Sequence, residues 1–425
     1  MAIKIGNLDI NSFKVGSDDC KIYLGDTLLY PTTPPTPSFD GKWLAIYSDS
    51  HTESAECDST SAITYNELQT IGTNLVNFIV GNCATSIGQS AFQYCRELEF
   101  IFISSGVTSI GNSALFQCRD ISSIVVDGDN TVYDSRNNCN SIIKTSTNEL
   151  IAGSKNTIIP NSVTSIGKVA FSVKNGLSNI DIPDSVTSIG VQAFYGCPSL
   201  TTITIGSGVT FIDGYAFANC TNLQRVTVNS NNATYDSRNN CNAIIETNTN
   251  TLLYGCRNTI IPNTVTTIGQ GAFSNCSGIT SCIIPSGVTT IGQGAFEGCS
   301  GMTTCTIGSG VTRIGNTAFR ECSSLSSVTI PDSVTSIGEE AFQRCSGMTS
   351  CTIGSSVSSI GEGAFGTCTS LTSVTVNAIV PPQLGYDALY DTNECPIYVP
   401  SQSVEAYKSA TNWSDYADRI QAILN

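Results

Sequence analysis

A motif of the form I-G-x-x-A-F-x-x-C recurs along this chain at a fixed spacing, and this spacing constrains the fold more than any other feature. Successive copies begin 23 residues apart, except for two steps of 56 residues that each hold one repeat and 33 further residues. A fixed period of this length is typical of a solenoid, in which each repeat forms one turn and contacts only its neighbours. The copies, with small variations, begin at Ile87, Ile110, Ile166, Ile189, Ile212, Ile268, Ile291, Ile314, Ile337 and Ile360.

The residues of one repeat predict two short strands and a turn. Cys351 and Ile353 alternate with polar residues, which predicts a strand with one buried face. Gly354 follows where other repeats have proline, so the chain turns there. Val357 and Ile360 predict a second extended segment, and EGAFGTC predicts a tight turn or a single helical turn. One repeat has too small a core to fold alone, so the repeats fold as a stack that needs capped ends.

The phenylalanine of the motif recurs with the period of the rung, so we expect a column of rings in the core. Its members are Phe194, Phe217, Phe273, Phe296, Phe319, Phe342 and Phe365.

The two longer steps contain similar segments that lie 102 residues apart. In the first, the pairs Ile142-Ile143 and Leu150-Ile151 flank a turn rich in Thr and Asn, which predicts a β-hairpin. The sequence TIIP then resumes the ordinary strand. The expected hairpin insertions cover about residues 127–157 and 229–259.

The stretch CSSLSSVTIPDSVTSIGEEAF, from Cys322 to Phe342, resembles the repeat of the BspA-like (Treponema pallidum type) leucine-rich repeat family. The resemblance covers about residues 83–425. It implies a β-rich leucine-rich-repeat solenoid, right-handed, with a parallel sheet and with short turns or single helical turns between strands. The hairpin-bearing repeats and the C-terminal segment also resemble parts of this family. Departures from the family pattern are Lys174 at the Cys position, Leu115 at the Phe position, and Cys282, Cys305 and Cys351 in place of branched aliphatic residues.

The two ends differ from the repeats. The N-terminus predicts a small β module on a stiff Pro-rich linker, so that the module moves independently, and its stretch KVGSDDCKIYLGDTLLY resembles short modules in tail-associated proteins of phages and prophages of gut Bacteroidales. Apolar residues at helical spacing from Val404 to Ile423 predict a helical cap on the last rung. The expected parts are the module at 1–30, the linker at 31–38, an N-terminal β cap at 39–82, the solenoid at 83–377 and a C-terminal cap at 378–425.

The charge of the chain argues against nucleic acid as a partner. With 34 acidic and 19 basic residues the net charge is −15, and phosphate binding requires a basic face.

No apolar run of 18 residues is present, so we expect no membrane span. The N-terminus also lacks the pattern of a secretory signal. The protein therefore remains in the cytoplasm, is exported by a route without such a signal, or has been trimmed. The resemblances to known proteins imply a cell-surface, extracellular or virion-associated location.

The cysteines predict buried thiols rather than a disulfide framework. Nine of the 19 share one repeat position, and neighbours in register lie about 4.8 Å apart, whereas a disulfide brings its Cβ atoms to about 3.8 Å. Free cysteine packs as a small hydrophobic residue. No CxxC motif is present, so we expect no metal site and no cofactor.

Two further stretches raise the question of catalysis or ion binding. His51, the single histidine, lies in SDSHTES, which reads more readily as a polar turn than as a catalytic site because no nucleophile elbow accompanies it. DGDN at Asp127–Asn130 could bind calcium, but the duplicated segment has NSNN there and lacks the carboxylates. We therefore expect that this protein is not an enzyme.

The outward positions of the main sheet remain for function. Alternation along the strands directs twelve side chains outward, most of them hydroxyls, and threonine also suits exposed strands without any binding role. The candidate ligand-binding residues are Phe102, Asp181, Thr204, Arg225, Thr227, Thr306, Thr329 and Thr352, and the other outward positions are Phe100, Thr202, Thr304 and Thr375.

Three functions stay open from the sequence. The first is a monomeric, adhesin-like recognition protein that holds a protein or glycan on another surface. The second is a structural or receptor-binding component of a phage or prophage tail, attached through residues 1–30. An enzyme is the third and the poorest fit.

Overall fold

The computed structural model describes residues 41–49, 51–57, 61–69 and 74–423, together with the backbone of short strands near the N-terminus. The chain divides into two compact units. Unit 1 comprises residues 1–200 and 208–217, and unit 2 comprises residues 201–207 and 218–425. The expected linker at 31–38 and its mobility lie outside the described residues. The N-terminal strands are β1 (Lys4–Ile5), β2 (Leu8–Asp9), β3 (Phe13–Val15), β4 (Ile22–Leu24) and β5 (Thr27–Leu28).

The remaining elements of each unit are short. In unit 1 they are β6 (Trp43–Tyr47), β7 (Thr52–Ala55), β8 (Ala62–Ile63), α1 (Tyr65–Gln69), β9 (Leu75–Val80), β10 (Ser86–Ile87), β11 (Phe100–Ile103), β12 (Ser109–Ile110), β13 (Ser123–Val126), β14 (Tyr133–Asp134), η1 (Arg136–Asn138), β15 (Ser141–Lys144), β16 (Glu149–Gly153), β17 (Ser165–Ile166), β18 (Asn179–Ile182), β19 (Ser188–Ile189) and β21 (Phe211–Ile212).

In unit 2 they are β20 (Thr202–Ile205), β22 (Arg225–Val228), β23 (Tyr235–Asp236), η2 (Arg238–Asn240), β24 (Ala243–Glu246), β25 (Thr251–Gly255), β26 (Thr267–Ile268), β27 (Ser281–Ile284), β28 (Thr290–Ile291), β29 (Thr304–Ile307), β30 (Arg313–Ile314), β31 (Ser327–Ile330), β32 (Ser336–Ile337), β33 (Ser350–Ile353), β34 (Ser359–Ile360), β35 (Ser373–Val376), β36 (Gln383–Leu384), β37 (Ile397–Val399), η3 (Ser401–Ser403), α2 (Val404–Ser409), η4 (Ser414–Arg419) and β38 (Ile420–Ala422).

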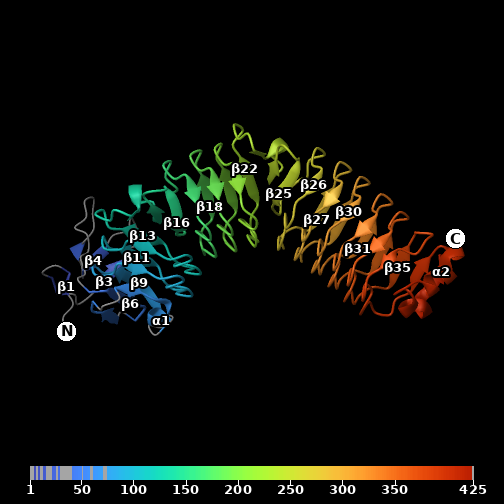
Figure 1. Ribbon diagram of the computed structural model, residues 1–425, viewed down its shortest axis with the longest axis horizontal. Helices are drawn as coiled ribbons and strands as arrows, with labels where there is room; N and C mark the ends of the chain where they lie inside the picture. The colour runs from blue at the N-terminus through green and yellow to red at the C-terminus, as the bar shows by residue number, and fades with distance from the viewer. Residues whose placement is uncertain are drawn as a thin grey trace. The chain divides into compact units, whose positions relative to one another are not determined.

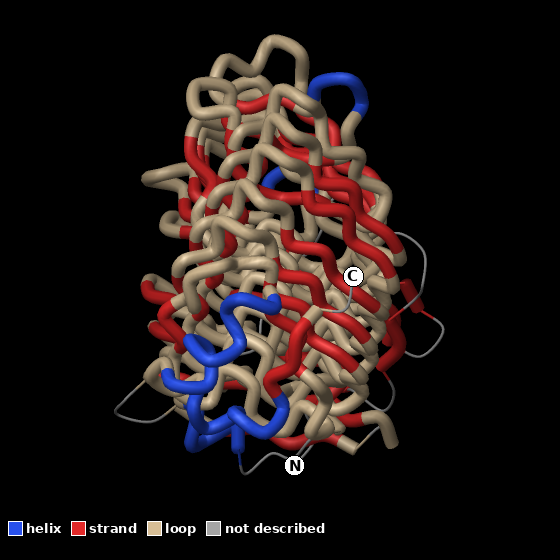
Figure 2. Tube along the Cα trace, turned by 90° about the vertical axis from the view of Figure 1, so that its right-hand side faces the viewer, coloured by secondary structure: helices blue, strands red, loops and turns tan. Residues whose placement is uncertain are grey.

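Each ordinary rung adds a four-residue strand to the main sheet and a two-residue strand to a second sheet (Figure 1). In unit 2, β31 pairs in parallel with β33, and Val328 lies opposite Cys351, one 23-residue repeat later. The two-residue strands β32 and β34 pair in the same way, with Ile337 opposite Ile360. Loops connect the strands, and little of the chain is helical (Figure 2). The predicted parallel-sheet solenoid with one turn per repeat is therefore confirmed.

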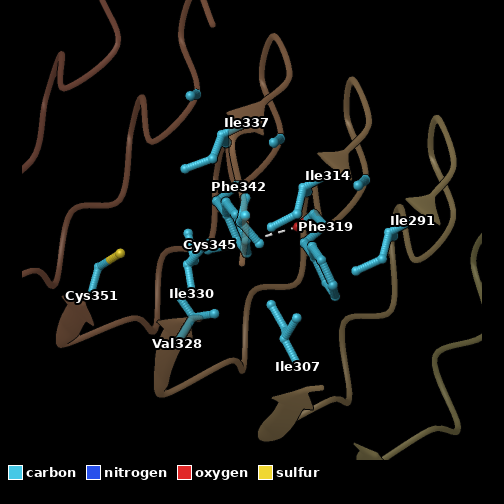
Figure 3. Packing of buried hydrophobic residues seen from close by; sticks show 14 of the residues in the cluster. Ile291, Ile307, Ile314, Phe319, Val328, Ile330, Ile337, Phe342, Cys345 and Cys351 are labelled. Carbon is cyan, nitrogen blue, oxygen red and sulfur yellow. Dashed lines mark hydrogen bonds between the residues drawn. The ribbon is translucent and has the colours of Figure 1, made fainter. Parts of the chain in front are cut away.

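Phenylalanine rings form a stacked column inside the rungs, as the sequence predicts. In unit 2, the fully buried ring of Phe319 lies parallel to Phe296 and Phe342, with centroids 5.1 and 5.0 Å away. Figure 3 shows Phe319 and Phe342 among the aliphatic residues of their rungs. Because the ring separation is close to the spacing of paired strands, each ring packs on both neighbours without distorting the backbone.

Two backbone positions in each A-F turn have positive φ. Around Phe319 these are Thr317, with φ 51°, and Glu321, with φ 60°. An α-helix requires negative φ, so the tight turn is the correct alternative and the single helical turn is wrong. Glycine suits such positions, whereas Val169 and Val173 in unit 1 hold β-branched side chains there at φ 52° and 59°.

The repeat cysteines lie beside the phenylalanine column as free thiols. Cys345 Sγ donates to the carbonyl oxygen of Phe319 at 3.1 Å, and Cys368 Sγ donates to that of Phe342 at 3.2 Å. Cysteine therefore provides both a small apolar group and a donor for a buried carbonyl of the preceding rung. All nine are buried and none forms a disulfide: Cys95, Cys118, Cys197, Cys220, Cys276, Cys299, Cys322, Cys345 and Cys368. Burial raises the pKa of Cys276 to about 12, which keeps its thiol protonated at neutral pH.

We expect these thiols to react with a thiol reagent only after unfolding. Of the 16 free cysteines in the described part of the chain, Cys282 and Cys305 alone are partly exposed. Titration of the native protein should therefore detect few thiols, and titration in denaturant without reductant should detect most of the 16. If fewer than half of them titrate in denaturant, the thiols are paired in disulfides and the prediction of buried thiols is wrong.

Hydroxyl groups connect successive rungs on the second sheet. Thr312 Oγ1 donates to the carbonyl of Thr289 at 3.1 Å, and Thr335 Oγ1 donates to that of Thr312 at 3.2 Å. A similar column of hydroxyl groups lies just before the main strands, where Thr372 Oγ1 donates to the carbonyl of Thr349 at 2.9 Å. Much of the threonine and serine in the sequence is thus used for bonds between rungs.

The duplicated segments form the predicted hairpins. In unit 1, β15 and β16 pair in antiparallel fashion, and β24 and β25 do so in unit 2. Arg136 forms an ion pair with Asp134 and donates to Asn148 at 2.9 Å in the hairpin turn. The TIIP sequences that follow do not resume a strand, contrary to expectation, because Ile158 and Ile260 bond to loop carbonyls at Cys139 and Cys241.

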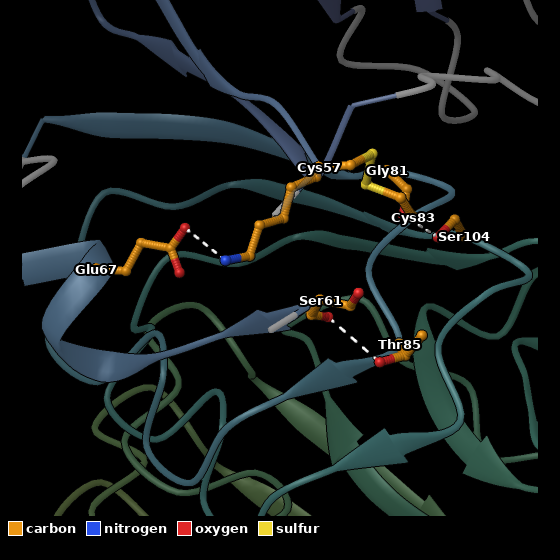
Figure 4. Close-up of a disulfide and its surroundings, with 8 residues drawn as sticks. Cys57, Ser61, Glu67, Gly81, Cys83, Thr85 and Ser104 are labelled. Carbon is orange, nitrogen blue, oxygen red and sulfur yellow. Dashed lines mark hydrogen bonds and ion pairs between the residues drawn. A yellow bond between two sulfur atoms is a disulfide. The ribbon is translucent and has the colours of Figure 1, made fainter. Parts of the chain in front are cut away.

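The first rungs of unit 1 contain features that the repeat does not predict. Its five-stranded sheet has the order β13-β11-β9-β6-β7, and β6 runs antiparallel to β9. A disulfide joins Cys57 to Cys83, and the buried Lys42 forms an ion pair with Glu67 of α1 at 3.2 Å (Figure 4). The sequence analysis did not predict this disulfide.

Lys174 occupies a cysteine position where the first hairpin interrupts the regular spacing. Its ammonium group is fully buried and donates to the carbonyls of Leu115 and Cys118 at 3.4 and 2.8 Å. Burial lowers its pKa. The longer side chain reaches carbonyls 56 or more residues earlier in the chain, across the interval that holds the inserted hairpin.

The C-terminal segment closes unit 2 with short helices and one strand. Tyr407 and Trp413 are buried and pack edge to face, with ring centroids 4.9 Å apart. Ile420 was expected on a helical face, but it begins β38, where it pairs with Ile397 of β37. The cap is therefore less helical than predicted because its last turn adds a strand to the main sheet.

Candidate recognition surface

The outer face of unit 2 consists of the side chains of its main strands that point away from the core, together with Ile260, which lies in a loop at the position one repeat before Ile283. In β31, Val328 and Ile330 are buried while Ser327 and Thr329 are exposed, and the other strands follow the same alternation. The residues of this outer face are Thr202, Thr204, Arg225, Thr227, Ile260, Ser281, Ile283, Thr304, Thr306, Ser327, Thr329, Ser350, Thr352, Ser373 and Thr375.

Six of the eight predicted site residues lie on this face. Thr204 is opposite Thr227 in the pair β20–β22, and Thr329 is opposite Thr352 in the pair β31–β33. Thr306, Thr329 and Arg225 are exposed, whereas Thr204, Thr227 and Thr352 are partly exposed. The parallel register thus aligns threonines from successive rungs at the spacing of paired strands.

The same face carries two exposed isoleucines that the sequence analysis missed. The exposed fractions are 72% for Ile283 and 75% for Ile260, one repeat earlier. Ile283 lies opposite Thr306 in the pair β27–β29. The signal was present in the sequence, because the first Ile of each I-I-P triplet falls at an outward position.

The composition of this face differs from that of the whole chain. Its positions include no carboxylate and one cation, Arg225, which makes no ion pair with any described residue. The A-F turns of unit 2 hold charges instead, where Arg320 lies 3.2 Å from Glu340 and 3.9 Å from Glu297. The outer face therefore presents hydroxyl groups, the apolar side chains of Ile260 and Ile283, and one positive charge.

The two remaining site residues lie in unit 1. Asp181 is exposed on β18, as predicted. Phe102 is 1% exposed and Phe100 is 2% exposed, so the prediction that they are accessible is wrong. They do point away from the main core, but they pack in a second apolar cluster with Leu44, Ile46 and Ile79.

The stretches considered for catalysis or ion binding form turns. Asp49 binds the ring of His51 in the β6–β7 turn, and this bond lowers the pKa of Asp49. The His51 ring also stacks on Tyr47. Asp127 accepts a hydrogen bond from the amide N–H of Asp129, and Asn229 takes this role in the second copy.

Within the described residues, no three ligating side chains gather at a metal site. No helix among these residues is long and apolar enough to cross a bilayer.

Solved structures of several bacterial proteins are similar to this chain. A leucine rich cell surface protein from Faecalibacterium prausnitzii is 26% identical, with a TM-score of 0.56, over 88% of this chain and 94% of that one. A leucine-rich repeat protein from Eubacterium ventriosum (22% identity, TM-score 0.50, covering 75% and 83%) and the pneumococcal vaccine antigen PcpA (15%, 0.51, 82% and 84%) share the fold. A search of the curated proteins found no match.

The sequence model of one repeat family matches most of the chain. This family is described as the BspA type leucine rich repeat region. Its matches cover residues 55–144, 141–252, 249–372 and 294–413. They include the hairpin-bearing rungs and much of the C-terminal cap. The chain therefore belongs to the BspA type leucine rich repeat family.

Proposed function

We propose that this protein is a non-catalytic, adhesin-like recognition protein that acts at a cell surface and binds its partner through the outer face of unit 2. The similarity to a leucine rich cell surface protein supports the location. The observation that carries the site is the exposed pair Ile260 and Ile283 on a face otherwise made of hydroxyls and Arg225. Large exposed aliphatic groups in neighbouring rungs are typical of contact surfaces.

The chemistry of the face favours an uncharged, extended partner. Threonine hydroxyls from successive rungs provide many weak hydrogen bonds, and the isoleucines provide an apolar centre. The surrounding negative charge of the chain would speed encounter with a cationic partner, but it is not arranged on this face and does not fix specificity. A segment of a protein or a glycan chain on another surface fits this description.

No observation favours the tail-component alternative. The stretch that resembles phage and prophage modules lies between Lys14 and Tyr30, where the structure describes no side chain. Attachment through residues 1–30 therefore stays a prediction from the sequence.

Replacing Ile283 with glutamate is expected to weaken binding at least tenfold, because a charge would occupy the apolar centre of the contact. The full chain is first screened against arrays of glycans and of extracellular proteins. Affinity for the strongest hit is then compared between the unaltered protein and Ile283→Glu. Ile283 is largely exposed, so the melting temperature should stay the same.

Ile158→Glu is the matched control. Ile158 is 79% exposed and starts the same I-I-P triplet, but it lies in unit 1. We expect this variant to bind normally. Unchanged affinity in both variants would place the site elsewhere, for example on the duplicated hairpins, and equal loss in both would contradict the assignment to unit 2.

A further inference from the structure

The A-F turn that precedes the first hairpin contains a buried backbone donor without an acceptor. In ordinary rungs the N–H at the phenylalanine position donates to the alanine carbonyl of the next rung, as Phe296 does to Ala318 at 2.7 Å. Leu115 occupies this position in the rung before the hairpin, and its N–H donates to no described residue. Leu115 is 6% exposed, so the capacity of this donor for a hydrogen bond is unused inside the protein.

The hairpin is the cause of this loss. The next A-F turn contains Ala170, whose carbonyl would accept from Leu115 in an uninterrupted stack. Gly153 of β16 donates its N–H to that carbonyl instead, at 2.8 Å. The N–H groups of Ser113 and Gln117 likewise have no acceptor in the described part of the chain, although these positions bond to the next rung in most ordinary turns. Three backbone donors are therefore left at one turn.

A cavity of about 120 Å³ lies beside these donors in unit 1. Ser113 and Leu115 line it, together with Val169 of the next A-F turn. The side chains of Ile142 and Ile151 make much of the remaining lining apolar. An apolar cavity of about 150 Å³ can hold benzene, so this cavity has room for about five or six non-hydrogen atoms.

Two charged side chains also line the cavity. Lys168 is exposed and forms no ion pair with any residue that the structure describes. Glu149 is partly exposed, and its Oε1 lies where a side chain at Gly167 would collide with it, 2.9 Å from an added Cβ. The glycine thus makes room for this carboxylate. Because the two charges are opposite, the N–H groups decide which ligand fits.

We propose that this cavity binds a small aliphatic carboxylate, whose oxygen atoms accept hydrogen bonds from the N–H groups of Ser113 and Leu115. A carboxylate accepts at two oxygens and requires no acceptor from the protein. Its bonds to backbone N–H groups are stronger than those of a neutral carbonyl, and oriented N–H groups are common anion sites. The hydrocarbon end packs on the isoleucines. This site is independent of the recognition proposed for the outer face of unit 2.

Butyrate, which has six non-hydrogen atoms, is the probe for this site. The full chain is labelled with ¹⁵N-leucine, and the amide signal of Leu115 is assigned by its loss in Leu115→Ile. Butyrate should shift this signal downfield to saturation and slow its hydrogen exchange about tenfold, because the N–H gains an acceptor. The signal of Leu325 in unit 2 should not move. An unchanged Leu115 signal at saturating millimolar butyrate, or an equal response to n-butylammonium, would overturn the proposal.

Three variants test the charge and the position of the bound carboxylate. Lys168→Met should weaken butyrate binding about threefold, and Glu149→Gln should strengthen it by a similar factor. Lys155→Met is the control, because Lys155 does not line this cavity, and it should bind as the unaltered protein does. Equal affinities in all three variants would show that butyrate binds elsewhere. The three positions are on the surface or partly exposed, so the fold should be retained in each variant.

Discussion

Replacing Phe319 with alanine is expected to lower the free energy of unfolding by about 3–5 kcal/mol. The ring is fully buried between two parallel rings, and its removal leaves a cavity against both neighbouring rungs. In a stack, each rung is stabilised mainly by its neighbours, so the loss should extend to the rungs of Phe296 and Phe342. Denaturant unfolding and amide hydrogen exchange of the three rungs measure the two effects.

Thr306→Ala is the matched control for this prediction. Thr306 is exposed on the outer face, where removal of a hydroxyl and a methyl group should cost less than about 1 kcal/mol. Phe319→Leu should fall between the two, because it keeps much of the volume and loses the ring stack. Equal destabilisation by the alanine variants would show that the faces of the strand are reversed.

Replacing Gly255 with alanine is expected to destabilise the protein by about 1–3 kcal/mol, although the change adds a single methyl group. A Cβ at this position would lie 1.9 Å from Cε1 of Phe273. That ring is buried and stacks on Phe296, so it has no free space into which it could move. Thermal unfolding of the variant measures the cost.

The control for Gly255→Ala is Gly128→Ala, since no atom lies within 4 Å of a Cβ added at Gly128. Restoring space with Phe273→Leu in the Gly255→Ala background should recover part of the lost stability, so that the two changes are not additive. A Gly255→Ala variant as stable as the unaltered protein would contradict this account. The first hairpin repeats the contact, with 2.0 Å between a Cβ on Gly153 and Phe171.

The sequence predicts the interior of the rungs well because the repeat samples the same position many times. A buried cysteine beside a buried phenylalanine recurs in most of the rungs at the same spacing. The outward direction of Thr329 follows from the alternation along its strand, and so does that of Ile283. Most of the candidate surface is thus predictable from local pattern alone.

The errors arise where the outcome depends on a partner that the local pattern does not contain. Alternation directs Phe102 away from the main core, but it cannot show that Phe102 packs there in a second buried apolar cluster. The Cys57–Cys83 disulfide joins two positions outside the repeat, so no register argument could pair them. In the C-terminal cap, Ile420 has helical spacing, yet an unpaired strand edge at β37 recruits it into the sheet.

The bonds between rungs also determine how a stacked repeat protein of this kind responds to mechanical load. In unit 2, thiol, hydroxyl and ladder bonds connect each rung to the next at intervals of one 23-residue repeat. A pull on the C-terminal end would load the outermost rung first, because rungs behind it share no bond with the free end. Each rung that peels away would release about 80 Å of extended chain at about 3.4 Å per residue. Such a stack would lengthen in equal steps under tension, while the rungs that remain folded would keep their structure.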